Sequence, residues 1–480
     1  MNLADLKQFT DQRWDRELIP HLVEYVKVPA KSPGFDASWA AHGYLQAVVK
    51  EAFAWGRAQK IAGLHIEIVA LEGKTPCIFF DVPATGGLGN ARTVLFYGHL
   101  DKQPEMVGWR DDLGPWKPVI EDGKLYGRGA ADDGYAVYAA LTLIAALDAQ
   151  GTPRPRCVGI IESCEESGSP DLPVYLELLA PRFGDVGLVA GLDSGCGNYE
   201  QLWVTTSLRG LVGGTLTVEV LSEGVHSGKA SGLVPSSFRI ARQLLNRIDD
   251  PATGRLIDPA FHAEIPAERL QQARTAGTIL GEQVWKEFPW VGCNHGPDAH
   301  AHAMPTTTDP VEGILARTWR PALSVTGAAG FPSIDAAGNV LRPKTTFKLS
   351  LRTPPTVDGE RATHQLRKLL TENPPYNARV SFEADWGATG WNAPETAPWL
   401  KRAADEASQA LFGKDAAWMG EGGTIPFMNM LGEKFPRAQF LITGVLGPHS
   451  NAHGPNEFLH IRYVKQLTAA VAGIVTQMPA

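Results

Sequence analysis

Four short apolar runs, each followed by a loop with acids or histidines, constrain the fold most strongly. The runs are Thr93–Tyr97, Cys157–Ile161, Val186–Ala190 and Gln439–Thr443. Continuous apolar runs of about five residues are typical of strands buried on both faces, as in a parallel sheet. Ligands of such sheets bind beyond the carboxyl ends of the strands. We therefore expect the four polar loops to lie together at one edge of a sheet.

Helical patterns separate these runs, and the middle of the chain has a different character. Helices are expected at Asp133–Gln150, Leu172–Leu179 and Pro398–Leu411, and strand–helix alternation predicts an α/β domain with a mostly parallel sheet. From about Gly210 the runs alternate between apolar and polar residues, as half-exposed strands do. We predict an inserted α+β domain at 208–387, so that residues 1–207 and 388–480 form the sheet domain.

Composition limits the partners and the compartment. The net charge is 44 minus 52, or -8, without a long Lys/Arg run, which argues against nucleic acid or an anionic membrane as the main partner. The N-terminus lacks the pattern of a signal peptide, and no apolar stretch is expected to approach the ~20 residues that span a bilayer. Five cysteines without a CxxC pair fit free thiols in a reducing compartment, so a cytoplasmic location is expected.

Two of the candidate site segments are His99-Leu-Asp101 and Asp132-Asp133. In the first, one residue can ligate a metal while the carboxylate orients the imidazole. The second segment opens the helix predicted at Asp133–Gln150. Acids at this position commonly act as an N-cap or favour the first turn of a helix, and this explanation suffices for Asp133. One carboxylate can bridge two divalent ions ~3.5–4 Å apart, which gives Asp132 a second use.

The other three polar loops carry Glu165-Glu166, Asp193 and the pair His449 and His453. The two glutamates could divide the roles of ligand and base. Asp193 alternatively forms a turn with the residues that follow it. Together, histidines and carboxylates supply the N/O donors that zinc or manganese prefers. The sequence has no cysteine cluster, which argues against a closed structural zinc site.

Competing motifs are weaker. Gly127-Arg-Gly-Ala-Ala-Asp132 has an acid where a dinucleotide loop needs glycine, and Gly224–Ala230 lacks the spacing and the Ser/Thr of a P-loop. Cys164 lies among acids, which raise a thiol's pKa and disfavour a nucleophile. A small cluster is interpreted as loop residues, with a second metal site as the alternative: His295, His300 and His302.

The order of motifs along the chain resembles the M20 metallopeptidases, closest to the branch of carnosinases and cytosolic nonspecific dipeptidases. The motifs are GHLD, DGKLYGRGAADD, ESCEESGS, LDSG, GVHSG, LSLR, EGGTIP and AHGPNE. The resemblance implies a dinuclear site at the strand ends and a lid and dimerisation domain formed by 208–387. DDGY departs from the DDKG of many relatives, and the stretch 285–340 matches no motif.

The resemblance also implies a role for each matching residue. Asp132 would bridge two metals, with His99 and Asp193 on one ion and Glu166 and His453 on the other. The resemblance thus selects Glu166 rather than Glu165, and His453 rather than His449, as the metal ligands. Asp101 would orient His99, and Glu165 would take a proton from the metal-bridging water. The residues implied to contact substrate are two of the lid, His226 from a partner subunit and Arg352 for the terminal carboxylate, together with Asn339 and Thr424. The Asp132–Asp133 peptide is cis in relatives.

The expected function is a dinuclear metallopeptidase that cleaves dipeptides or short peptides with a free C-terminal carboxylate. The alternative is an M20-type amidohydrolase, a deacylase or carboxypeptidase that acts on N-acyl amino acids or longer substrates. An inactive binding protein is a further alternative. Two divalent ions per subunit are expected, zinc first and manganese as the alternative, in a homodimer.

Overall fold

A computed structural model describes residues 2–90, 92–291 and 303–479. The chain divides into two compact units. The first comprises Met1–Thr206, Ala393–Met419 and Met430–Ala480, and the second comprises Ser207–Asn392 and Gly420–Asn429. The segment 208–387 falls within the second unit, which also takes in residues 388–392 and the short stretch 420–429.

A nine-stranded mixed sheet forms the centre of the first unit. Its strand order is β1 (His65–Val69), β2 (Cys77–Val82), β6 (Arg156–Glu162), β3 (Arg92–His99), β7 (Asp185–Gly191), β17 (Gln439–Ile442), β8 (Trp203–Leu208), β15 (Trp391–Asn392), with β16 (Ala417–Glu421) paired to β8. The four strands expected from the apolar runs are β3, β6, β7 and β17. They are adjacent and parallel, as predicted. Their carboxyl ends therefore meet at one edge.

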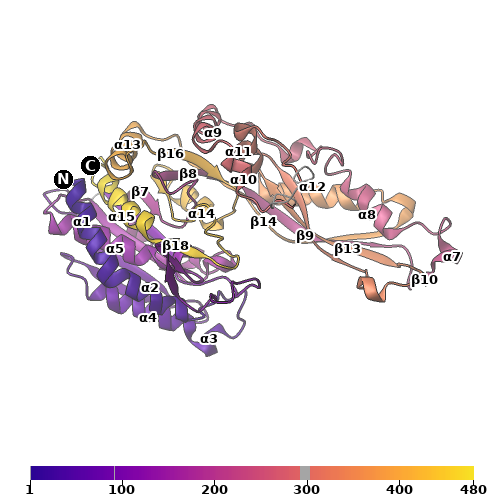
Figure 1. Ribbon diagram of the computed structural model, residues 1–480, viewed down its shortest axis with the longest axis horizontal. Coiled ribbons are helices and arrows are strands. Elements are labelled where there is room, and N and C mark those ends of the chain that lie inside the picture. The colour runs from indigo at the N-terminus through magenta and orange to yellow at the C-terminus, as the bar shows by residue number, and fades with distance from the viewer. Residues whose placement is uncertain (1, 91, 292–302, 480) are drawn as a thin grey trace. The chain divides into compact units, whose positions relative to one another are not determined.

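Helices α4 (Tyr44–Arg57) and α5 (Ala136–Ala149) pack on strands of this sheet. The other helices of the unit are α1 (Leu3–Arg13), α2 (Ile19–Lys27), α3 (Trp39–His42), α6 (Leu172–Phe183), α13 (Pro398–Phe412), α15 (Ile461–Val475) and the part of α14 (Pro426–Lys434) from Met430 onward. Helix α5 is rich in Ala and Leu, which favour helix, and it packs on β3 with α1, α4 and α15 around it. The first and last helices lie side by side, so the two chain ends are near each other (Figure 1).

Helix α5 corrects one expectation from the sequence. Together with the turn before it, the stretch Ala130–Ala149 is 20 residues long and apolar enough to cross a membrane by length and composition. The expectation that no apolar stretch approaches this length was wrong. All of this stretch except its last two residues, Asp148 and Ala149, is buried inside the protein, which is the environment of a core helix.

The second unit contains a four-stranded antiparallel sheet in the order β11 (Ala322–Ala329), β13 (Lys344–Thr353), β9 (Gly210–Glu219), β14 (Arg379–Ala388). Alternate residues of β13 are buried because side chains point to opposite faces of a strand. Helices α8 (Ser237–Leu245) and α12 (Gly359–Thr371) cover the apolar face. Its remaining elements are β10 (Val225–His226), α7 (Ser227–Ala230), α9 (Ala267–Leu280), α10 (Gln283–Lys286), α11 (Pro310–Thr318) and β12 (Val340–Leu341).

Candidate metal centre

The carboxyl ends of the parallel strands bring the predicted ligands together. His99 is the last residue of β3, the turn Glu165–Ser167 follows β6, and Asp193 comes two residues after β7. His453 lies in the loop between β17 and β18 (Phe458–His460), and β18 forms a small antiparallel sheet with β5 (Lys124–Tyr126) and β4 (Val119–Glu121). Segments far apart in sequence thus meet at one sheet edge, as parallel strand geometry requires.

Asp132 differs from its predicted local structure. It lies in the turn Ala130–Gly134, with φ -125° and ψ 89°, four residues before helix α5 begins at Ala136. The expectation that Asp132 and Asp133 open the helix as caps was wrong. Neither side chain caps α5, and Oδ2 of Asp133 instead accepts the main-chain N–H of His99 at 3.3 Å. The Asp132–Asp133 peptide is cis, as the resemblance implied.

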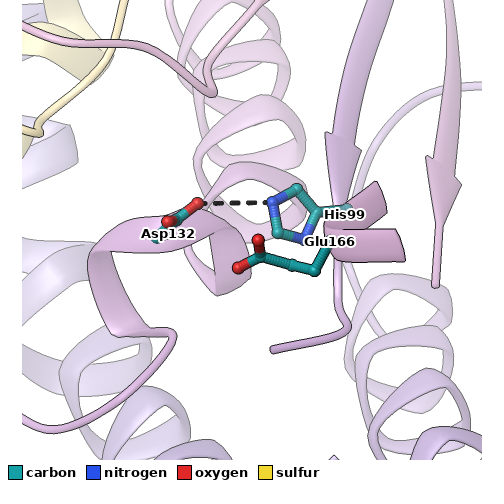
Figure 2. A group of neighbouring side chains, drawn as sticks. All are labelled: His99, Asp132 and Glu166. Atoms are coloured by element: carbon teal, nitrogen blue, oxygen red, sulfur yellow. Dashed lines mark ion pairs between the residues drawn. The ribbon is translucent and has the colours of Figure 1, made fainter. Parts of the chain in front are cut away.

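The two carboxylate oxygens of Asp132 face two different histidines. Oδ1 lies 3.4 Å from Nε2 of His99, and Oδ2 lies 2.9 Å from Nε2 of His453. The same His99 nitrogen is 3.7 Å from Oδ2 of Asp193, and the same His453 nitrogen is 3.4 Å from Oε2 of Glu166. Figure 2 shows the Asp132 and Glu166 carboxylates turned toward the His99 ring. Asp132 is therefore placed between a His99–Asp193 pair and a His453–Glu166 pair.

The donor set fits divalent cations. His99 with Asp132 and Glu166, and His99 with Glu165 and Asp193, each bring one potential ligand atom per residue within 4.8 Å of the others. Although imidazoles and carboxylates approach one another closely here, three of these buried atoms make no hydrogen bond of suitable geometry within the described residues: His99 Nε2, Asp132 Oδ2 and Glu166 Oε1. Buried polar atoms without partners are costly, and a bound cation would satisfy them. Imidazole and carboxylate are the ligand types of zinc and manganese.

Burial among like charges shifts the acids strongly. Burial and the neighbouring Asp193 raise the pKa of Glu165, while burial and Asp132 raise the pKa of Glu166. Burial raises the pKa of Asp193 to about 7. Although burial opposes it, the surrounding acids hold the pKa of His99 well above its usual value. So many acids in one buried cluster are the electrostatic signature of a functional or metal site.

Asp101 connects His99 to the turn that carries Glu165 and Glu166. Its Oδ1 and Oδ2 accept the main-chain N–H groups of Glu165 at 3.1 Å and Glu166 at 3.0 Å. Nδ1 of His99 lies 3.1 Å from the main-chain oxygen of Asp101 and 3.4 Å from its Oδ1. A hydrogen bond from Nδ1 leaves Nε2 free to ligate, which is the usual role of an outer partner of a metal histidine.

Two polar residues near the predicted ligands, one of which bonds to a ligand directly, were not predicted from the sequence. Gln103 donates a hydrogen bond from Nε2 to Oε2 of Glu166 at 2.6 Å. Glu162, buried behind the glutamate turn, accepts hydrogen bonds from Cys164 at 3.2 Å and Ser169 at 2.7 Å. Gln103 and Glu162 lie within or beside the GHLD and ESCEESGS motifs, and that proximity is the only signal in the sequence that could have found them.

The loop that carries His453 is anchored by a buried ion pair. Arg128 pairs with Glu457, and its Nη2 donates to the main-chain oxygens of His453 at 3.0 Å and Gly454 at 2.9 Å. Oε1 of Glu457 accepts the N–H of Gly129 at 2.8 Å. Both charged side chains are at most 1% exposed, whereas the side chain of His453 is 55% exposed. This ion pair was also missed, although both partners belong to quoted motifs.

The predicted substrate-contact residues lie in the second unit, in two groups. His226 of β10 and Asn339 are exposed, and the N–H of Ser227 donates to the main-chain oxygen of Asn339 at 2.9 Å where β10 pairs with β12. In the other group, Nη1 of Arg352 donates to Oγ1 of Thr424 at 2.6 Å. The structure thus brings His226 to Asn339 and Arg352 to Thr424.

The remaining candidates from the sequence are the cysteines and the cluster of three histidines. Cys164 is buried, and burial and Glu162 raise the pKa of its thiol, which disfavours a nucleophile. Cys77, Cys157 and Cys196 are also buried, and none of them forms a disulfide within the described part of the chain. His295, His300 and His302 lie outside the described residues.

Comparison with known proteins identifies relatives of this site and fold. A model of peptidase family M20/M25/M40 matches residues 95–477. The Cys-Gly metallodipeptidase DUG1 of Saccharomyces cerevisiae is 30% identical over 390 residues, which cover 77% of this chain and 76% of that relative. The Beta-Ala-His dipeptidase of Homo sapiens is 26% identical over 401 residues, covering 78% of this chain and 74% of the relative.

Solved structures share the fold over the whole chain. The structure of the dipeptidase Dug1p from Saccharomyces cerevisiae has a TM-score of 0.74 and 22% identity, and covers 99% of this chain and 98% of that one. Human carnosine dipeptidase 1 also has a TM-score of 0.74, with 20% identity and coverage of 100% and 99%. With a family model matching most of its length, this chain belongs to peptidase family M20/M25/M40.

Proposed function

We propose that this protein is a dipeptidase that uses two divalent metal ions to hydrolyse dipeptides or short peptides with a free C-terminal carboxylate. The position of Asp132 supports this most directly, because its two oxygens face His99 and His453 separately. The division assigns His99 and Asp193 to one ion, Glu166 and His453 to the other, and Asp132 to both. The names of the relatives support dipeptides as the substrate class.

The reaction follows from the placement of the acids. When bound, the two ions would lower the pKa of a water molecule and stabilise negative charge on the scissile carbonyl. Glu165 takes the proton from the attacking water and returns it to the leaving amine. Its side chain is 12% exposed beside His99, and its main-chain N–H is held by Asp101. A fixed, largely buried carboxylate with a raised pKa suits general base and acid in turn.

The second unit is proposed to recognise the substrate. Arg352 would bind the terminal carboxylate together with Thr424, because a guanidinium matches a carboxylate with two hydrogen bonds. His226, with Asn339 beside it, would polarise the scissile carbonyl in the site of a partner subunit. A homodimer is supported by β11, an edge strand of the sheet, and by exposed apolar side chains on and near it, with Val325 48% and Ile334 90% exposed.

Metal analysis combined with a substrate panel tests the proposal. We expect about two zinc ions per chain after purification without chelator, with manganese as the alternative, and loss of turnover on chelation that either metal restores. The panel contains dipeptides, tripeptides and N-acyl amino acids. Hydrolysis of N-acyl amino acids without hydrolysis of dipeptides would instead establish the deacylase alternative. Less than one ion per chain and no turnover would indicate a binding protein.

Paired glutamine variants separate the two adjacent glutamates. Glu165→Gln should keep both metals and lose about 10²–10⁴-fold in kcat, the usual contribution of a general acid–base. Glu166→Gln should reduce the occupancy of one ion, because its Oε2 lies with His453 and Asp132. Full turnover of Glu165→Gln with both metals bound would overturn the assignment of the base.

A further inference from the structure

Arg209 contacts the segment that contains Thr424 through both its main chain and its side chain. Oγ1 of Thr424 donates to the main-chain oxygen of Arg209 at 2.7 Å and accepts from Nη1 of Arg352 at 2.6 Å. The side chain of Arg209 meanwhile reaches the same segment two residues earlier, where Nε donates to the main-chain oxygen of Gly422 at 3.3 Å. The hydroxyl that contacts Arg352 is therefore placed by Arg209.

The guanidinium of Arg209 lies against the backbone of Gly422. A Cβ atom at position 422 would come within 3.2 Å of Nη2 of Arg209 and within 2.8 Å of the main-chain oxygen of Arg317. A side chain there would force the arginine or helix α11 to move. Because glycine has no Cβ, Gly422 of the EGGTIP motif permits the guanidinium of Arg209 to approach the backbone this closely.

Arg209 also ties this segment to the end of helix α11. Its Nη1 donates to the main-chain oxygens of Ala316 at 3.4 Å and Arg320 at 3.5 Å. The carbonyls at a helix C-terminus lack partners within the helix and favour a cation. Arg209 reaches these three carbonyls on two segments from two separate nitrogens, Nε and Nη1, whereas a lysine ammonium would offer its donors from a single nitrogen.

Arg209 and Arg352 form a positively charged pair without acidic partners. Among the described residues, neither side chain forms an ion pair with a carboxylate. Burial lowers the pKa of Arg209 to about 10, and the nearby charges of Arg352 and Arg317 add to this. Burial also lowers the pKa of Arg352. Two neighbouring guanidinium groups without a carboxylate of their own attract an anion.

We propose that Arg209 is a positioning residue for the subsite that binds the substrate's terminal carboxylate. It fixes the Gly422–Thr424 segment, so that the hydroxyl of Thr424 holds the guanidinium of Arg352 in one arrangement, and the charge of Arg209 adds to the attraction for the anion. This inference rests on the proposed function of Arg352 and Thr424. Arg209 itself uses its side-chain donors on main-chain oxygens.

Two variants and a matched control test this role. Arg209→Lys keeps the charge and Arg209→Met keeps the side-chain volume, and both lose the fork. The control is Arg247→Met in the same unit. Arg247 also donates to three main-chain oxygens at the end of a helix, α12, those of Leu369 at 3.0 Å, Glu372 at 2.6 Å and Asn373 at 2.8 Å, and it has no part in the proposed subsite.

The substrates are a dipeptide with a free carboxylate and the same dipeptide with a C-terminal amide. For the free acid, both Arg209 variants should raise KM about tenfold with kcat changed less than about threefold, as expected for a weakened charge-assisted contact. The preference for acid over amide should fall in parallel. A purely structural defect would lower the active fraction, and hence kcat, for both substrates equally and leave the preference unchanged. Arg247→Met should behave in that way.

The outcomes distinguish this inference from the proposed function. Suppose that the wild-type protein prefers the free acid over the amide. If Arg209→Lys then has the wild-type preference and the wild-type KM for the free acid, the positioning role of Arg209 is refuted, and the proposed carboxylate subsite is not. If the unchanged protein cleaves the amide as well as the acid, terminal-carboxylate recognition is refuted, and the role of Arg209 with it. If Arg209→Met does not fold, Arg209→Lys decides the question.

Discussion

Asp101 accepts the main-chain N–H groups of Glu165 and Glu166 and lies beside Nδ1 of His99. An asparagine at this position would keep one acceptor but turn an NH₂ group toward a main-chain N–H. Such a buried mismatch costs about 1–3 kcal/mol. We therefore expect Asp101→Asn to weaken metal binding by about 10–100-fold, as loss of an outer partner usually does. Competition with a chromogenic chelator measures the affinity, and kcat/KM measures the consequence.

Asp148→Asn is the control for this variant. Asp148 also accepts a main-chain N–H, that of Ala62 at 3.0 Å, and pairs with Arg154 at 2.9 Å. It lies at the C-terminal end of helix α5, whereas Asp132 precedes the helix. Its loss should lower stability and leave metal affinity unchanged. Equal metal affinity in Asp101→Asn and the unchanged protein would contradict the orienting role of Asp101.

At the scale of elements, the sequence predicted the strands that carry the site better than those around it. Strands β3, β6, β7 and β17 were found because each is a continuous apolar run that a polar loop follows. Strand β2 has the same apolar character but pairs antiparallel with β6, and no ligand loop marks its end. The predicted helices correspond to α5, α6 and α13, with α5 beginning three residues later than expected.

The local structure around the ligands was harder to predict, for two physical reasons. Asp132 has the sequence signature of an N-cap, yet tertiary contacts hold it in a turn where its oxygens reach His99 and His453. Arg128 and Glu457 are 329 positions apart in sequence, so no local pattern joins them. The choices of Glu166 and His453 rested on the family resemblance alone. The comparisons confirm the family, and the two assignments stay predictions.

The loop after β17 depends on Arg128, and this gives a prediction at the element scale. Arg128→Met leaves Glu457 buried without its partner, which should cost about 3–5 kcal/mol of unfolding free energy. The double variant Arg128→Met/Glu457→Met removes the unpaired charge and should recover most of that stability. Activity should stay low in both, because the main-chain oxygens of His453 and Gly454 still lack their donor. Urea denaturation and kcat of the folded protein separate the two effects.

The Arg156–Asp81 pair is the matched control for the loop. Arg156 pairs with Asp81 at 2.6 Å and donates to the main-chain oxygens of Arg182 at 2.6 Å and Phe183 at 3.1 Å. It begins β6, at the end of the strand away from the site. Arg156→Met should lower stability without lowering the kcat of the folded protein. Recovery of activity in the Arg128 and Glu457 double variant would show that the ion pair serves stability alone.

For the whole molecule, the two units divide the proposed work. The predicted metal ligands and Glu165 belong to the first unit, which three stretches of chain build. The predicted substrate contacts belong to the second, where His226 lies on β10, Asn339 directly precedes the paired strand β12, and Arg352 donates to Thr424. A site completed by His226 of another subunit would make a dimer necessary for turnover, and complementation between two inactive variants can test that.

We expect His226→Ala and Glu165→Gln each to have little activity alone. In a mixed dimer, the His226→Ala subunit keeps its own Glu165 and receives an intact His226 from the other subunit, so one of the two sites is complete. After random exchange in an equimolar mixture, about a quarter of all sites should be active. Light scattering follows the dimer while turnover is measured. If the mixture gains no activity although mixed dimers form, or if a strict monomer is fully active, His226 does not act across subunits.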